Sequence, residues 1–316
     1  MKTKNMKREK PSILSRVGTT KMKGETPPYR SYRSLAKDPV HVADALRLAD
    51  KAAKTEAAPT GCQALDYHRG GLLPGSITVL AAEPFMGHHQ VALSLAASVA
   101  IKYRRPTLFV STDWPVMSAA RYVANGRAAA SLENVPLHFY DAFGQNFDEI
   151  AESIWSLFGS AEEEARCLVL DSLGDFFPEK REGDRGAELH YILDYLREIT
   201  SVLSLTTLLI ADLRSNPFAP LRRPKAQDLE YFDIVGKYAD VFFLLSAPPG
   251  EGPDSDERNL EVVRDRFCGC ISGTRVSLSE LSRGLKSRNK PSFAKDAFVK
   301  KGRKSGHSPA KGVKTI

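Results

Sequence analysis

The segment between residues 77 and 100 restricts the fold of this chain more than any other. A short apolar run, Ile77 to Leu80, leads into a loop at 82–89, and a second apolar run covers residues 91–100. Strand, tight loop and helix in this order are typical of a phosphate-binding loop, in which the helix N-terminus faces an anion. We therefore predict a strand at 77–81, the loop at 82–89 and an amphipathic helix over 91–100.

The loop departs from a working phosphate-binding loop at two positions. Such a loop ends Gly-Lys-Ser/Thr, where the Lys contacts phosphate and the hydroxyl binds Mg²⁺. Here His88 and His89 follow Gly87. An imidazole is mostly neutral at pH 7 and Mg²⁺ prefers oxygen ligands, so we predict a nucleotide site in which ATP and Mg²⁺ binding are weakened. The predicted cofactor-binding residues are Glu83, Pro84, Phe85, Met86, Gly87, His88 and His89.

The two histidines have other interpretations from the sequence alone. If catalysis has been lost, a pair of histidines at a helix start can be ordinary surface residues. A zinc site needs three or four ligands, and only two are adjacent here. The run Cys268-Gly269-Cys270 also lacks a second pair at ligand spacing, so we expect ordinary thiols there.

Apolar strands alternate with helical segments through most of the chain. The predicted strands after the first are 107–111, 136–140, 167–172, 206–212 and 239–245, and the predicted helices are 116–130, 147–158 and 187–203. We expect an irregular segment at 214–237 and a hairpin formed by 260–266 and 275–278. This alternation predicts an α/β fold with one mainly parallel sheet flanked by helices.

Aspartates stand at the ends of several predicted strands. Asp171 and Asp212 end the fourth and fifth strands, and Asp113 follows the second. In open α/β sheets, ligands bind at the carboxyl ends of the strands, where a carboxylate can hold a metal ion. Asp171 is therefore the predicted Mg²⁺ ligand, directly or through water.

The charge is distributed unevenly along the chain. Residues 1–35 contain ten Lys and Arg and two acids, and residues 283–316 contain eleven Lys and Arg and one acid. These two arms carry a net +18 and the residues between them −11, which together make the net charge of +7. Basic segments without periodicity are typical of disordered arms, which bind polyanions by releasing counterions. We predict nucleic-acid contacts in the second arm; a solvated tail with no dedicated partner is the alternative. The predicted contact residues are Lys300, Lys301, Arg303, Lys304 and Lys311.

The sequence disfavours several classes of protein. No apolar run reaches the roughly 18 residues that a membrane span requires. Residues 1–16 lack the apolar region of a secretory signal, and the four cysteines are too scattered for a disulfide framework. We therefore predict a cytoplasmic protein with no membrane partner, and a mitochondrial presequence is the alternative for the basic N-terminus.

Several short motifs occur in the order and at the spacing of one known family. Gly70-Gly71-Leu72-Leu73-Pro74-Gly75 precedes the first strand, Pro84-Phe85-Met86-Gly87 forms the loop, and Val169-Leu170-Asp171-Ser172-Leu173 ends the fourth strand. On these motifs, the chain from Thr60 to about Leu278 resembles the RecA-like C-terminal domain of DnaB-type replicative helicases. The resemblance implies a RecA-like P-loop NTPase fold, ATP and Mg²⁺ as cofactors, and single-stranded DNA and replication proteins as partners.

The chain also departs from the pattern of this family. His88 and His89 replace the Lys and Thr of the loop. Asp113 stands in place of the catalytic glutamate, and Asp212 in place of the glutamine sensor. The predicted residues of this degenerate catalytic site are Asp113, Asp171, Asp212, Arg264 and Arg266. The two arginines match positions that complete a neighbouring subunit's site in the resembled family.

These observations divide the chain into four parts. We predict a disordered basic arm at 1–36, a linker helix at 37–59, a RecA-like helicase-type domain at 60–282 and a disordered basic tail at 283–316. The linker helix carries an apolar stripe formed by Val42, Ala45, Leu46 and Ala49. In the resembled family such a helix docks on the neighbouring subunit, which implies a homo-oligomeric ring, by resemblance a hexamer. We expect no counterpart of the family's N-terminal primase-interacting domain.

Three functions are compatible with the sequence. We favour a DnaB-like, DNA-binding protein associated with replication or recombination whose ATPase activity is weak or absent, because the loop has lost charge that stabilises phosphoryl transfer. The first alternative is an active ATP-dependent helicase or translocase with a variant loop, in which a protonated His88 meets the phosphate. The second alternative is a structural ring or scaffold subunit.

The charge of the second arm leads to a prediction about DNA affinity. Deleting residues 283–316 should weaken binding to single-stranded DNA and flatten its salt dependence, because fewer counterions are released. Fluorescence anisotropy of a labelled oligonucleotide over a series of NaCl concentrations measures both quantities, and deletion of residues 1–35 is the matched comparison. An affinity and salt slope unchanged by the 283–316 deletion would show that this arm is a passive tail.

Overall fold

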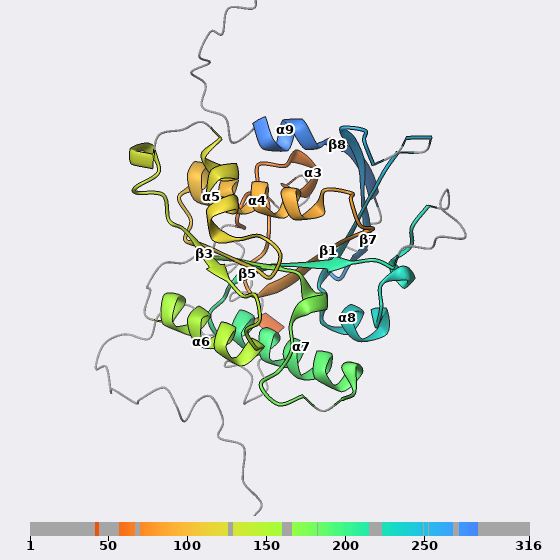
Figure 1. Cartoon of the computed structure of the whole chain (residues 1–316). Helices are drawn as coiled ribbons and strands as arrows, with labels where there is room; N and C mark the ends of the chain where they lie inside the picture. The colour runs from red at the N-terminus through yellow and green to blue at the C-terminus, as the bar shows by residue number, and fades with distance from the viewer. Residues whose placement is uncertain are drawn as a thin grey trace, which may run out of the picture.

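The chain forms one eight-stranded sheet with helices on both faces (Figure 1). The computed structural model describes residues 42–43, 57–66, 70–125, 129–159, 166–181, 183–214, 223–248, 250–251, 253–267 and 272–283. The strands are β1 Ser76–Ala82, β2 Thr107–Ser111, β3 Leu137–Asp141, β4 Cys167–Asp171, β5 Thr206–Asp212, β6 Val241–Ser246, β7 Glu257–Asp265 and β8 Ser272–Ser277.

The strands lie in the order β3-β2-β4-β5-β1-β6-β7-β8. Pairing is parallel from β3 to β6, and β7 and β8 continue the sheet as an antiparallel hairpin. Strands β1, β2, β4 and β6 are buried along their whole length, as expected for parallel strands covered on both faces. The predicted α/β fold with a mainly parallel sheet is therefore confirmed.

Helices cover both faces of this sheet. They are α3 Gln63–Asp66, α4 His88–Tyr103, α5 Val116–Ala124, α6 Phe147–Phe158, α7 Arg185–Val202, α8 Phe232–Tyr238 and α9 Leu278–Arg283, with short 3₁₀ helices η2 Ala129–Ser131, η3 Leu173–Asp175 and η4 Ala226–Asp228. In Figure 1, α3, α4, α5 and α9 lie on one face and α6, α7 and α8 lie on the other. Two clusters of buried apolar side chains fill the space between the helices and the sheet.

Helix α4 differs from the predicted amphipathic helix. All of residues 91–100 are buried, because α5 and α9 contact the helix in addition to the sheet (Figure 1). A helix that is apolar on every side is typically a buried one, and the many Ala and Ser residues of α4 allow its neighbours to approach closely. The helix also begins at His88, so the two histidines form its first turn.

Two other segments differ from the predictions. The helix predicted at 116–130 ends at Ala124, because Asn125 adopts a left-handed conformation with φ 43. The segment predicted as irregular, 214–237, contains most of α8. This helix is short, but Ile234 and Val235 bury their side chains in the core, and that tertiary contact stabilises it.

The residues before β1 form a closed turn that includes the start of the Gly70–Gly75 motif. The Asp66 carboxylate accepts hydrogen bonds from Thr60 N, Thr60 Oγ1 and Gly61 N, each at 2.8 Å. Gly71 has φ 135, and a Cβ atom at this position would lie 2.1 Å from the carbonyl oxygen of Ala58. A larger residue at position 71 would therefore separate the two segments that pair there.

Several predicted parts lie outside the described residues. They include both basic arms, apart from Arg283 at the start of the second. They also include all the predicted DNA-contact residues, Lys300, Lys301, Arg303, Lys304 and Lys311. Of the helix predicted at 37–59, Val42 and Ala43 are described as helical. The prediction is wrong at residues 57–59, because Ala58 pairs with Leu72 in an isolated β-bridge there. The predicted domain limits therefore stay predictions. In the described part of the chain, no helix has the length and apolar character needed to cross a membrane.

Candidate functional site

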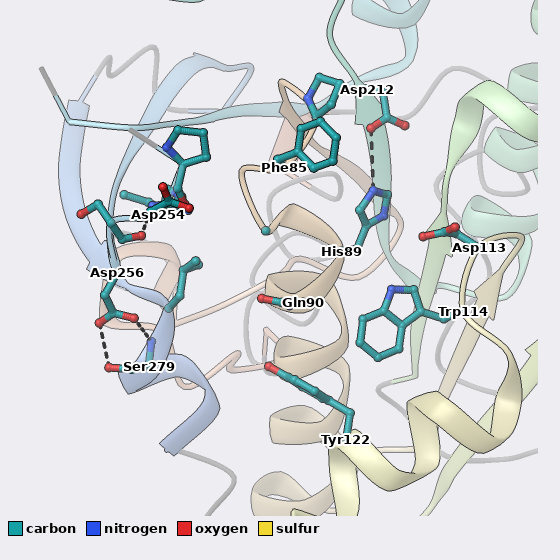
Figure 2. Close-up of a pocket in the computed structure, with 16 residues that line it drawn as sticks. Phe85, His89, Gln90, Asp113, Trp114, Tyr122, Asp212, Asp254, Asp256 and Ser279 are labelled. Atoms are coloured by element: carbon teal, nitrogen blue, oxygen red, sulfur yellow. Dashed lines mark hydrogen bonds and ion pairs between the residues drawn. The ribbon is translucent and has the colours of Figure 1, made fainter. Parts of the chain in front are cut away.

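Strand pairing brings the altered loop and the strand-end aspartates to one edge of the sheet. β1 and β5 pair so that Ala82, the last residue of β1, lies opposite Asp212. β2 and β4 pair so that Ser111 lies opposite Asp171. Because parallel strands end at the same edge, the loop after β1 meets both aspartates there. A cavity of about 810 Å³ opens beside them (Figure 2).

The loop backbone makes a sharp turn into α4. Gly87 has φ 80, and a Cβ atom at this position would lie 3.0 Å from Leu278 Cδ1. Phe85 also has a positive φ, 69, and its side chain is 86% exposed. A bulky residue in this conformation is uncommon, so the loop holds Phe85 in place at some conformational cost.

The predicted cofactor-binding residues do not all face the cavity. Those that line it are Pro84, Phe85, Gly87 and His89. Met86 turns its side chain into the core, and His88 is fully buried beneath the loop. Glu83 is partly buried and is not among the described lining residues. Successive side chains of the loop point in different directions around the turn at Gly87, so some face the cavity and others face the core.

His88 contacts Asp212 in the interior of the domain. Its Nε2 lies 2.8 Å from Asp212 Oδ1, and its side chain is 1% exposed. Its Nδ1 has no hydrogen-bond partner among the described residues. The interpretation of this residue as an ordinary surface histidine is therefore wrong, because the pairing of β1 with β5 places an aspartate directly over the start of α4.

His89 connects the two aspartates. Its Nδ1 lies 2.5 Å from Asp171 Oδ1, and its Nε2 lies 3.8 Å from Asp212 Oδ1. Figure 2 shows the ring of His89 between Asp212 and Asp113, with one ring nitrogen directed at the Asp212 carboxylate. The Asp171 carboxylate is fully buried and also accepts a hydrogen bond from Ser111 Oγ at 3.3 Å. The rings of His88 and His89 lie with their centroids 4.0 Å apart.

These contacts shift two pKa values in opposite directions. Burial by itself lowers the pKa of His89, but the hydrogen bond to Asp171 and the charges of the three nearby aspartates outweigh it, so the pKa is raised above its ordinary value. Burial by itself raises the pKa of Asp212, but the hydrogen bond from His88 and the charges of both imidazoles lower it below its ordinary value. Each partner therefore favours the charged form of the other.

The residues at this edge do not fit Mg²⁺ and a triphosphate. His89 already occupies the carboxylate of Asp171, the predicted Mg²⁺ ligand. Four carboxylates line the cavity, on Asp113, Asp212, Asp254 and Asp256. In Figure 2, Asp254 and Asp256 lie across the cavity from the loop, and the Asp256 carboxylate accepts hydrogen bonds from Ser279. The cavity wall therefore carries negative charge on both sides. Like charges repel most strongly where water is partly excluded.

Arg258 is a site residue that the sequence analysis missed. It is 1% exposed, and its guanidinium donates to the carbonyls of Met86, Pro253, Ser255 and Glu257. Among the described residues that line the cavity it is the one arginine, and these bonds direct its donors toward the backbone. In β7 every second residue from 258 to 262 is buried, and Arg258 lies on this buried face with Leu260 and Val262. This alternation in the sequence could have identified Arg258 as a buried arginine.

Arg264 and Arg266, predicted to complete a neighbour's site, lie away from the cavity in the described chain. Arg264 Nη1 donates to the carbonyl of Gly236. Arg266 Nη2 donates to the carbonyl of Lys237 at 2.8 Å, and Nη1 lies 3.1 Å from Asp240 Oδ1. Both arginines therefore hold β7 against the region of α8, and their role toward a neighbour stays a prediction.

Comparison with known sequences shows relatives among proteins of DNA metabolism. No protein-family model matches the chain. The chain is 24% identical over 235 residues to the replicative DNA helicase DnaB of Leifsonia xyli, a match that covers 66% of this chain and 51% of the relative. It is 32% identical over 151 residues to the DNA repair and recombination protein RadB of Halobacterium salinarum, a match that covers 46% of this chain and 61% of the relative. The chain thus spans about half the length of the first relative and under two thirds of the second.

Comparison with solved structures shows the same fold. An isolated ATPase domain superposes with a TM-score of 0.67 and 16% identity over 78% of this chain and 98% of that chain. A DnaB-like replicative helicase, studied with primase, superposes with a TM-score of 0.64 and 16% identity over 76% of this chain and 65% of that chain. The described domain has the RecA-like fold of DnaB-type helicases.

The pKa of His89 leads to a prediction about stability. Because it is raised in the folded protein, its contribution is fully present below the unfolded value of about 6.5 and is lost as pH rises through the folded value. In His89→Gln the decrease in the free energy of unfolding between pH 6 and pH 9 should therefore be smaller than in the wild type. Urea unfolding followed by circular dichroism, with a chelator present, measures it.

The control for this prediction is a histidine elsewhere on the sheet. His138 on β3 is exposed, so His138→Gln should keep the wild-type pH dependence. If His89→Gln and His138→Gln show the same pH dependence as the wild type, His89 does not couple protonation to folding.

Proposed function

From the RecA-like fold of DnaB-type helicases, we propose that this protein binds DNA in replication or recombination and turns over ATP far more slowly than a helicase. The observation that carries the proposal is the double contact of His88 with Asp212 and His89 with Asp171. The two imidazoles stand at the positions where the loop Lys and hydroxyl would contact phosphate and Mg²⁺.

The energetic argument concerns charge. Phosphoryl transfer depends on positive groups that stabilise the transferring phosphate, supplied by the loop Lys and Mg²⁺. In this chain the loop has no Lys, and His89 directs a ring nitrogen at Asp171. The cavity wall adds carboxylates where a helicase needs cations. Each change removes stabilisation of the same transition state, so we expect weak ATP binding and slow hydrolysis.

The place in DNA metabolism rests on the relatives and on the arms. DnaB is named a replicative helicase and RadB a repair and recombination protein. The strongly basic arms would supply the DNA contacts of a protein whose ATPase domain no longer drives movement along DNA. Single-stranded DNA is the proposed form, by analogy with a helicase.

An active ATPase with a variant loop remains the competing function. The raised pKa of His89 favours it, because a protonated imidazole would place positive charge beside the cavity. Against it, the same contacts direct that charge toward two aspartates and away from a bound phosphate.

ATP turnover decides between the two functions. In the presence of Mg²⁺ and single-stranded DNA, phosphate release by the wild type should fall well below about 1 s⁻¹, the lower end of the usual range for enzymes. The double variant His88→Lys with His89→Thr restores the missing groups and should bind a fluorescent ATP analogue about tenfold more tightly than the wild type, because a charge-assisted hydrogen bond contributes about 1.5–3 kcal/mol.

The control for added charge is His138→Lys, a change on an exposed part of β3 that should leave ATP affinity unchanged. Turnover by the wild type at several per second, abolished in Asp171→Ala, would overturn the proposal and establish the active ATPase.

We also propose that copies of the chain assemble head to tail. The first support is the apolar stripe at Leu46 and Ala49 in the predicted linker helix. The second is the pair of arginines at the end of β7, Arg264 in the strand and Arg266 directly after it. A head-to-tail contact repeats until it closes, so a ring is the default product and a hexamer the size that the family suggests.

Sedimentation velocity tests the assembly. Leu46→Asp with Ala49→Asp should dissociate the ring without a change in the circular dichroism of the domain, because charge would enter an apolar contact. Arg47→Asp, on the opposite side of the same predicted helix, is the matched control and should leave the assembly intact. A wild type that is monomeric alone, with nucleotide and with DNA would exclude the homo-ring.

A further inference from the structure

We propose that His88, His89 and Asp212 bind one divalent transition-metal ion of the zinc type, and that Asp171 positions His89 for it. This inference rests on the proposed function, because both concern the same altered loop. It assigns that loop a metal ligand set in place of Mg²⁺ and nucleotide.

The first support is the arrangement of the ligand atoms. One ring nitrogen from each histidine and one oxygen of Asp212 lie within 4.8 Å of one another. Two ligands of a tetrahedral zinc ion, each about 2.0–2.2 Å from the metal, lie about 3.3–3.6 Å apart. His89 Nε2 and Asp212 Oδ1 are 3.8 Å apart, which is near that separation. His88 Nε2 and Asp212 Oδ1 are 2.8 Å apart, so this contact must widen by about 0.5 Å when a metal replaces the hydrogen.

The second support is the orientation of His89. Its Nδ1 lies 2.5 Å from a carboxylate oxygen of Asp171, so a neutral ring carries its proton on Nδ1. In this tautomer the Nε2 lone pair is directed toward Asp212, and a bound metal ion would take the place of the hydrogen that Nε2 carries when the ring is protonated. A metal-binding histidine typically donates its other ring N–H to a carboxylate in this way, which fixes its tautomer and raises its basicity.

The third support is the orientation and burial of His88. This imidazole is fully buried, and its single polar contact directs Nε2 at the proposed site. Its Nδ1 has no partner among the described residues, so no second hydrogen bond there opposes a small rotation of the ring. A buried imidazole aimed at the same carboxylate as its neighbour is the geometry of a two-histidine, one-carboxylate site.

The fourth support is the balance of charge. The Asp171 carboxylate is fully buried, and Asp212 and Asp113 lie beside it at the same edge. Buried carboxylates are paired with cations or coordinate metal ions, because an uncompensated charge is costly to bury. A dication between the two histidines and Asp212 would take over the compensation that a protonated His89 gives to Asp171 and Asp212.

The ligand types select the ion. Imidazole nitrogens suit Zn²⁺ and its transition-metal neighbours, whereas Mg²⁺ and Ca²⁺ prefer oxygen atoms. Three protein ligands leave one position open for water. His89 and Asp212 line the cavity, so the open position would face it (Figure 2).

Metal titration of the full chain tests the proposal. After treatment with a chelator, the wild type should bind one Zn²⁺ per chain by isothermal titration calorimetry, and excess Mg²⁺ should not compete. Asp171→Asn should weaken zinc binding by about 10–100-fold, the usual effect of losing an outer partner of a metal ligand. His88→Gln, His89→Gln and Asp212→Asn remove ligands and should each weaken it by more than Asp171→Asn does.

Two controls exclude other zinc-binding residues. His138→Gln, on the exposed face of β3, should bind zinc as the wild type does. The double variant Cys268→Ser with Cys270→Ser should also retain binding, and Co²⁺ in the wild type should give a spectrum without thiolate charge transfer. Circular dichroism checks folding, and His89→Gln and Asp212→Asn are milder tests than His88→Gln because their side chains are 25% and 39% exposed.

The proposal is overturned if the wild type binds no Zn²⁺, or if folded His89→Gln and Asp212→Asn bind it as tightly as the wild type. Binding that disappears only in the cysteine variant overturns it as well. The outcome is separate from that of the ATP experiments if these are run on chelator-treated protein supplied with Mg²⁺. A failure to bind zinc therefore leaves the proposed slow turnover standing, and fast turnover leaves the zinc titration valid.

Discussion

The burial of β1 between β5 and β6 is the constraint on which the other parts of this structure depend. All seven residues of β1 are buried, and the strand pairs with a neighbour along each edge. The backbone N–H and C=O groups of this strand need hydrogen-bond partners along both edges. Its register against β5 and β6 is therefore fixed, and so is the point at which it ends. The loop after Ala82, the start of α4 and the end of β5 are therefore held together before any side chain in the site is considered.

Charges inside the domain are compensated close to where they are buried. Asp240 is 4% exposed, accepts a hydrogen bond from Ile77 N and pairs with both Arg197 and Arg266. Arg258 satisfies its donors on four backbone carbonyls and so ties the loop at 253–257 to the loop before α4. Such groups are retained because removing one partner leaves an unpaired charge, which costs several kcal/mol. Arg266 therefore has a role within the chain, independent of any role between chains.

The two residues at the start of α4 pair with acidic side chains at this edge of the sheet. In a phosphate-binding loop the edge offers cations and N–H groups to an anion. Here the histidines pair with Asp171 and Asp212, and further carboxylates line the cavity. Under the proposed function, the RecA-like fold is kept while the charges at this edge favour a cation. Fold and site thus diverge, as they can when a site changes on an unchanged scaffold.

Much of the architecture could be predicted from the sequence, because strand and helix periodicity depends on neighbouring residues. The parallel strands, the turn at Gly87 and most of α6 and α7 follow from apolar patterns and turn residues. The burial of α4 could not be predicted, because it depends on the packing of α5, the next helix, and of α9, from a distant part of the chain, over it. The short helix α8 was missed for the same reason.

The sequence by itself determined that His88 and His89 follow Gly87, where a phosphate-binding loop has Lys and Ser or Thr, and that aspartates end the fourth and fifth strands. Only the tertiary structure decided which aspartate meets which imidazole. His88 and Asp212 are separated by 124 residues, and His89 and Asp171 by 82, so their contacts depend on strand order and register. From the sequence, two adjacent histidines were too few for a metal site. The pairing of β1 with β5 brings Asp212 to the two histidines as the third ligand of the proposed metal site, because parallel strands of matched register end side by side.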